Sequence, residues 1–112
     1  MGVTLKRLAT AALSDSAQPV YSPSGVNAQV DACAMTNNTD VAQTVDLWVT
    51  AGGGPTAETI VLKSFKVDPA ATSRAWSMGG QVIESGSTVY ARASAPGAVI
   101  LVMSGREQTV AA

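Results

Sequence analysis

The sequence predicts an all-β protein, a single antiparallel β-sandwich of jelly-roll type with about eight strands. Apolar and polar residues alternate with a period of two in several segments, which is the spacing of half-buried strands. Clusters of glycine, proline, asparagine and serine interrupt the chain about every 8 to 15 residues, as they do in sandwiches and barrels. The length of 112 residues indicates one domain, residues 1–112.

The first strands are predicted from short alternating runs. Residues 3–9 form the first strand, within an N-terminal arm or edge strand that covers residues 1–18. Residues 8–13 are also compatible with a helix in isolation. Residues 26–36 are predicted as a long strand, because apolar residues stand at even-numbered positions up to 34 and mostly polar residues stand between them.

An asparagine-centred turn follows this long strand. Asn and Asp, which dominate residues 37–40, favour turns because their side chains bond to nearby backbone and tolerate left-handed backbone angles. Residues 45–50 then alternate again, with Val45, Leu47 and Val49 on one side of the strand. We expect the two strands that flank this turn to pair with each other.

The second half of the chain alternates between loops and strands. Residues 51–57 contain three glycines and a proline and are predicted to be an exposed loop. Residues 59–67 carry apolar side chains on both faces, which indicates a central strand or one covered by a neighbouring subunit. The remaining predicted strands are residues 72–78, 82–83, 88–94 and 98–104. Residues 106–112 are expected to be a flexible tail that frays or reaches a partner.

The composition predicts a thin core. Hydrophobic residues make up 46% of the chain and aromatic residues only 4%, so valine, with 14 copies, and other small side chains must fill the interior. Small side chains bury little area each, and apolar burial contributes roughly 25 cal/mol per Å². We therefore expect the protein to gain further burial by self-association, as a homo-oligomer.

The charge pattern argues against nucleic acid and membranes as partners. Seven Lys and Arg balance eight Asp and Glu, and the basic residues are scattered instead of forming the basic face that phosphate binding requires. No apolar run approaches the roughly 20 residues that span a bilayer. The apolar run after Lys6-Arg7 is short and contains Thr10, so we expect no secretory signal.

Four segments together resemble a known family. They are residues 19–25, with Tyr21 before a Pro-Ser-Gly turn; residues 36–49, with the asparagine turn; residues 82–91; and residues 102–107, with Ser-Gly-Arg-Glu. In these segments, and over nearly the whole chain, the sequence resembles small β-sandwich virion proteins of tailed bacteriophages. Ser87 stands where that family usually has an acidic residue.

The resemblance implies a structural role without a catalytic site. The expected function is a non-enzymatic virion protein that self-associates and docks on the particle, as a capsid decoration or cement protein or as a head–tail or tail accessory protein. Its expected partners are itself and other virion proteins. The implied location is the virion, after synthesis in the host bacterial cytoplasm.

The residue types present agree with the absence of an enzyme. The chain has no histidine, so Ser-His-Asp and Cys-His sites and imidazole metal ligands are absent in their usual forms. Gly52-Gly53-Gly54 is not followed by the Lys of a phosphate-binding loop. A pair of carboxylates remains conceivable as a hydrolase site, and this is the third functional hypothesis.

No cofactor or metal is expected. Four aspartates could offer oxygen to calcium, but none stands in an alternating calcium loop, so we interpret them as solvated acids. They are Asp31, Asp40, Asp46 and Asp68. Cys33 lies in an apolar strand and is expected to be a small buried hydrophobe.

The candidate binding residues are aromatic and arginine side chains. Trp, Tyr and Arg carry much of the binding energy in protein interfaces. The interface candidates are Trp48, Trp76, Arg74, Tyr90 and Arg92. The tryptophans have three interpretations: they cover the core, they dock on a protein, or they stack on sugar rings. The last makes a carbohydrate-binding or host-attachment module, with a surface glycan as partner, the alternative function.

Overall fold

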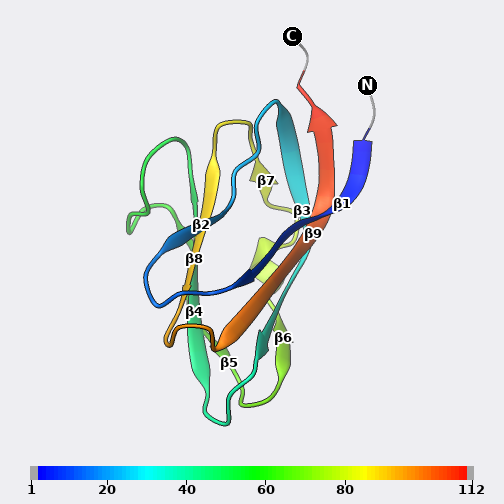
Figure 1. Ribbon diagram of the computed structural model, residues 1–112. Helices are drawn as coiled ribbons and strands as arrows, with labels where there is room; N and C mark the ends of the chain where they lie inside the picture. Colours follow the sequence, from blue (N-terminus) through cyan, green and yellow to red (C-terminus); the bar gives the residue numbers. More distant parts are fainter. Residues whose placement is uncertain (1–2, 111–112) are drawn as a thin grey trace.

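Two antiparallel sheets lie face to face in the computed structural model, which describes residues 3–110 (Figure 1). The first sheet has the strand order β1 (Val3–Ala12), β9 (Val99–Thr109), β3 (Val26–Asn37) and β6 (Thr72–Arg74), and β7 (Val82–Ile83) also pairs with β3. The second sheet has the order β2 (Gln18–Tyr21), β8 (Thr88–Ala93), β4 (Gln43–Thr50) and β5 (Ile60–Val67). A short 3-10 helix, η1 (Trp76–Met78), follows β6. The all-β prediction is confirmed, with nine strands in the described residues.

The expected pairing of the two strands that flank the asparagine turn is wrong. β3 pairs with β9 on one side and with β6 and β7 on the other, whereas β4 pairs with β5 and β8 in the second sheet. Residues 38–42 therefore cross from one sheet to the other (Figure 1). The sequence pattern does not distinguish a hairpin from such a crossing. In both cases a polar turn joins two strands, and each strand buries one face.

Asn37 holds this crossing in place. Its side chain is buried, and Nδ2 donates hydrogen bonds to the carbonyl oxygens of Val41, at 2.7 Å, and Val67, at 3.1 Å. Its Oδ1 accepts from the backbone N–H of Thr39 at 2.9 Å. Because Val67 belongs to β5 and Asn37 to β3, this one amide joins the two sheets.

Two other predicted boundaries change. The expected strand over residues 72–78 ends at Arg74, because the chain there turns into η1. The last strand does not end at residue 104 but continues to Thr109, paired with both β1 and β3. Residues 106–109 of the expected tail therefore lie in β9, and residues 111–112 lie outside the described residues.

The core between the sheets consists of aliphatic and sulfur-containing side chains. Valine and leucine from both sheets are fully buried, and methionine and cysteine fill the spaces between them. The largest members are Leu13, Met35, Leu47, Met78, Ile83, Leu101 and Met103. Among the described residues, the core cluster contains no aromatic side chain, as the composition predicts.

Candidate interface

The predicted interface residues separate into two places. Trp48, Tyr90 and Arg92 lie on the outer face of the second sheet, where Trp48 is opposite Tyr90 across the β4–β8 pair. Arg74 and Trp76 lie at the other side of the molecule, along the β6 edge of the first sheet. The structure therefore does not bring the five residues into one site.

Trp48 is covered although it points away from the core. Only 8% of its surface is exposed. The guanidinium carbon of Arg92 lies 5.5 Å from the centre of its ring, within the range of a cation–π contact. Pro55, Thr56 and Ala57, from the loop that precedes β5, line a shallow hollow together with Trp48. This arrangement leaves no open ring face for a sugar to stack on.

Asp46 fixes Arg92 over Trp48. Its Oδ2 accepts a hydrogen bond from Arg92 Nε at 2.8 Å, and its Oδ1 accepts one from the backbone N–H of Ser64 at 2.7 Å. Ser64 has a left-handed backbone with φ of 52°, at a bulge where β5 loses register with β4. The sequence offers no signal for this contact, since Asp46 and Ser64 are 18 residues apart and the bulge is not encoded in the alternation.

Trp76 is the most exposed large apolar side chain in the described residues. It is 77% exposed, and the guanidinium carbon of Arg74 lies 5.0 Å from the centre of its ring. The backbone explains its position. Ala75 is buried and donates its N–H to Cys33 O, after which η1 lifts the chain away from β3 until Gly80 N–H returns to Val30 O. One ring face therefore carries Arg74, and the rest of the indole faces solvent.

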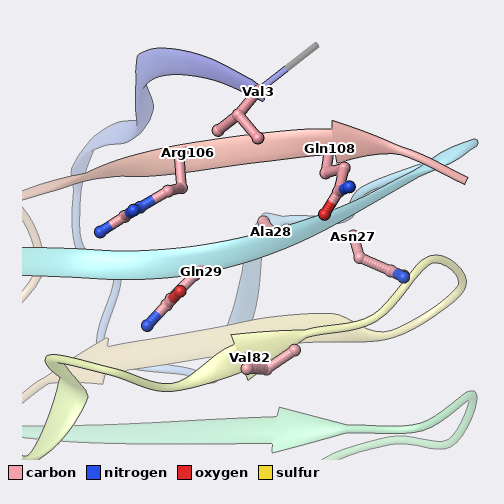
Figure 2. A pocket seen from close by; sticks show the side chains of 7 residues that line it. All are labelled: Val3, Asn27, Ala28, Gln29, Val82, Arg106 and Gln108. Carbon is pink, nitrogen blue, oxygen red and sulfur yellow. The ribbon is translucent and has the colours of Figure 1, made fainter. Parts of the chain in front are cut away.

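A shallow hollow of about 280 Å³ lies on the outer face of the first sheet. Figure 2 shows Val3 and Val82 at its opposite margins, with side chains of β3 and β9 between them. Its lining residues are Val3, Asn27, Ala28, Gln29, Val82, Arg106 and Gln108. Arg106 is the one charged side chain in this lining, and its Nη2 donates to Asp31 Oδ1 at 3.0 Å.

Three of the four candidate aspartates make ion pairs, and the thiol is buried. Asp31 and Asp46 pair with arginines, and Asp68 lies 3.9 Å from Lys66. Within residues 3–110, no three Cys, Asp or Glu side chains gather in a group that could hold a metal ion. Burial raises the pKa of the Cys33 thiol to about 12, which keeps it protonated at neutral pH and unreactive.

A contact between Tyr21 and Glu107 joins the two sheets near the end of β9, and the sequence does not signal it either. The Tyr21 hydroxyl, from β2, donates a hydrogen bond to Glu107 Oε2, from β9. Glu107 Oε1 also lies 3.4 Å from Lys6 Nζ of β1, and the Glu107 side chain is only 15% exposed. Tyr21 and Glu107 are 86 residues apart, so only the folded chain reveals the contact.

Comparison with known proteins identifies no matching family model, no matching curated protein and no matching solved structure. In the part of the chain that the structure describes, no helix has the length and apolar character needed to cross a membrane.

Proposed function

We propose that this protein is a non-enzymatic structural protein of a tailed-bacteriophage virion, which self-associates and docks on other virion proteins. The observation that carries the proposal is the distribution of exposed large apolar side chains. Val3, Leu5, Trp76 and Val82 are 56–77% exposed, and all four lie on the first sheet or on the segment along its edge. Val41, in the crossing between the sheets, is also exposed and lies apart from them. Apolar surface concentrated on one side of a small protein is typical of an interaction surface.

The charged groups support an interaction role in preference to catalysis. Arg106 is fixed by pairing with Asp31, and Arg74 stacks on Trp76, as arginines do in preformed interfaces. A protein with this function would be made in the bacterial cytoplasm and would be found in the particle.

The strand order supports a jelly-roll description of the fold. Without the two-residue β7, the first sheet has the order β1-β9-β3-β6 and the second β2-β8-β4-β5. The chain then changes sheet at every connection except that between β4 and β5. This alternation supports a description as two Greek keys wound into a double-sheet jelly roll, a fold found among viral capsid domains.

Two measurements test the virion assignment. Immunogold electron microscopy with an antibody to this protein should label particles from the parent phage at a repeated position, on the head, neck or tail. Light scattering on the purified protein should show a mass above that of one chain. A strict monomer that binds neither heads nor tails would overturn the proposal.

Carbohydrate binding is the second candidate, and the exposed ring of Trp76 favours it. Trp48 no longer supports this function, because Arg92 and the loop before β5 cover it. If the chain binds a host-surface glycan, a glycan array should show binding that Trp76→Ala abolishes and that Val82→Ala, a change of another exposed apolar residue on the same edge, preserves. An array without signal for the unmodified protein would exclude this candidate.

A further inference from the structure

The outer face of the first sheet is mostly apolar over one half of its two central strands, where β9 begins and β3 ends, and polar over the other half. Leu101 and Met103 of β9 are fully buried, so by alternation Ile100 and Val102 point away from the core, and both are half-buried. On β3, Ala34 and Thr36 occupy the matching outward positions. The outer face of the second sheet differs, since Trp48, the Asp46–Arg92 pair and the loop before β5 occupy it.

The register of the strands gives the pattern of this face. Val102 is opposite Ala34, and Ile100 is opposite Thr36. One central strand thus presents branched aliphatic side chains, and its neighbour presents smaller ones. Further along the same face, Leu5 and Val82 stand at the two margins of one row, with Arg106 and Gln29 between them.

We propose that this face is a two-fold interface with a second copy of the chain, with the symmetry axis parallel to the strands and between β9 and β3. The proposal depends on the proposed self-association and specifies the surface. Such an axis lays β9 of one copy on β3 of the other. Val102 then packs on Ala34 of the second copy, and Ile100 packs on Thr36 of the second copy. Large side chains meet small ones, as interdigitated sheet interfaces require.

The charges on the two central strands are compatible with this axis. Arg106 comes to lie over Gln29 of the second copy, and Asp31, beside the β3 bulge, over the region of Ser104 of the second copy. No charged residue of the two central strands meets a like charge, which would disfavour the association. At the margins, Leu5 meets Val82 of the second copy, and two of the most exposed apolar side chains cover each other.

The area of the face is sufficient for a dimer. The face comprises three strands of 10 to 12 residues, β1, β9 and β3, and the short strands β6 and β7. At about 4.8 Å between strands and about 3.3 Å per residue, these strands cover roughly 600 Å². Two copies would together bury about 1,200 Å², the lower end of the range of stable interfaces. Aligned sheets cross at about 30°, so the residue pairing applies to the central strands and becomes less exact toward the margins.

Charged substitutions in two separate preparations test the axis. Val102→Lys and Ala34→Glu each place an unpaired charge in the interface, and each should raise the dimer dissociation constant at least about tenfold in sedimentation velocity. Mixing the two variants should restore a heterodimer with nearly the original affinity, because the lysine introduced in one chain then faces the glutamate introduced in the other. Thr44→Lys, on the outer face of the second sheet, is the matched control and should leave dimerisation unchanged.

The outcomes separate the surface from the function. If the unmodified protein stays monomeric at every concentration, self-association itself fails. If it self-associates and both variants do so equally well, the first-sheet interface is overturned and the proposed function stands. A mixture that does not recover overturns the two-fold axis. Circular dichroism melting confirms that each variant folds, and Ile100→Glu with Thr36→Lys provides a second pair if either first variant does not.

Discussion

The two tryptophans show how differently one residue type is used in this chain. Trp48 lies under Arg92 and beside the loop before β5, and 8% of it is exposed. Trp76 stands on a one-turn helix beyond the edge of the first sheet and is 77% exposed. Each has an arginine against its ring, so the arginine contact does not distinguish them. The two tryptophans differ instead in burial.

This difference predicts unequal effects on stability. Trp48→Ala removes a covered indole and should lower the free energy of unfolding by about 3 kcal/mol. Trp76→Ala removes a mostly solvated one and should change it by no more than about 0.5 kcal/mol. Urea denaturation of both variants at one protein concentration measures the two values. Equal losses would contradict the burial that separates the two residues.

Gly105 is fixed by the close approach of β9 to β3. A Cβ at this position would lie 2.0 Å from the carbonyl oxygen of Gln29 and 3.1 Å from the Cα of Val30. Both atoms are backbone, so no side-chain rotation can make room. The contact lies beside the β3 bulge between Val30 and Ala32, where the register with β9 shifts.

Gly105→Ala should therefore cost about 3 kcal/mol or more, because the two strands must separate to admit the methyl group. The neighbouring change Ser104→Ala, at a half-buried outward position, should alter the free energy of unfolding by at most about 0.5 kcal/mol. Thermal and urea unfolding of the pair measure the difference. Equal stability of the two variants would show that β9 can move away from Gln29 at little cost.

At the scale of the elements, local patterns predicted where strands lie but not which strands pair. The alternation in residues 45–50 and the turn at residues 37–40 are local properties, and β3 and β4 form where these patterns indicate. Pairing depends on which sheet each strand joins, and the contacts that go with it, such as the hydrogen bond from Asn37 to Val67 of β5, are not encoded in any local pattern. The candidate surface was likewise predicted residue by residue, while the cover over Trp48 and the contact between Tyr21 and Glu107 depend on segments far apart in the chain.

The turn between β5 and β6 contains a strained residue. Ala70 has φ of 52°, a left-handed conformation that is unfavourable for any residue with a Cβ. It is exposed, and its N–H donates to the carbonyl oxygen of Thr39 at 2.9 Å, so the turn is tied to the crossing between β3 and β4. The conformation is maintained by this contact despite the local preference of alanine.

Ala70→Gly should raise the free energy of unfolding by about 1 kcal/mol, because glycine adopts this conformation without a steric penalty. Ala71→Gly, one residue later and without a positive φ, should lower it by about 0.5 kcal/mol through the added entropy of the unfolded chain. If Ala70 is strained, denaturation curves should show changes of opposite sign in the free energy of unfolding for the two variants. A loss of stability in both would contradict it.

At the scale of the whole molecule, the sandwich is joined by polar contacts at both ends. Asn37 connects β3 to β5 where β9 begins, and Tyr21 connects β2 to Glu107 near the other end of β9. Both contacts are satisfied hydrogen bonds between sheets whose fully buried cluster, within residues 3–110, consists of aliphatic and sulfur-containing side chains. Directional bonds at the two ends therefore add to the apolar packing in fixing the relative position of the two sheets.

The contact between Tyr21 and Glu107 predicts a pH dependence of stability. Burial, together with the hydrogen bond to Glu107 and its negative charge, raises the pKa of Tyr21 above its ordinary value of 10.0. The unfolded chain then loses the phenolic proton at a lower pH than the folded protein does. The contribution of Tyr21 to stability is complete below about pH 10 and is lost as the pH rises toward the folded-state pKa.

Tyr21→Phe removes both the hydrogen bond and this titration. We expect the variant to be less stable than the unmodified protein by about 1–2 kcal/mol at pH 7, because Glu107 loses a donor in a mostly covered position. Between about pH 9 and about pH 11, the unmodified protein should lose stability more steeply, so that the two curves converge. Tyr90→Phe, on the outer face of the second sheet, controls for the loss of a tyrosine as such and should leave the steep alkaline loss in place. Parallel stability curves for Tyr21→Phe and the unmodified protein across this range would mean that the phenolic proton of Tyr21 titrates at the same pH in the folded and unfolded chains. The Tyr21 hydroxyl would then not join the two sheets.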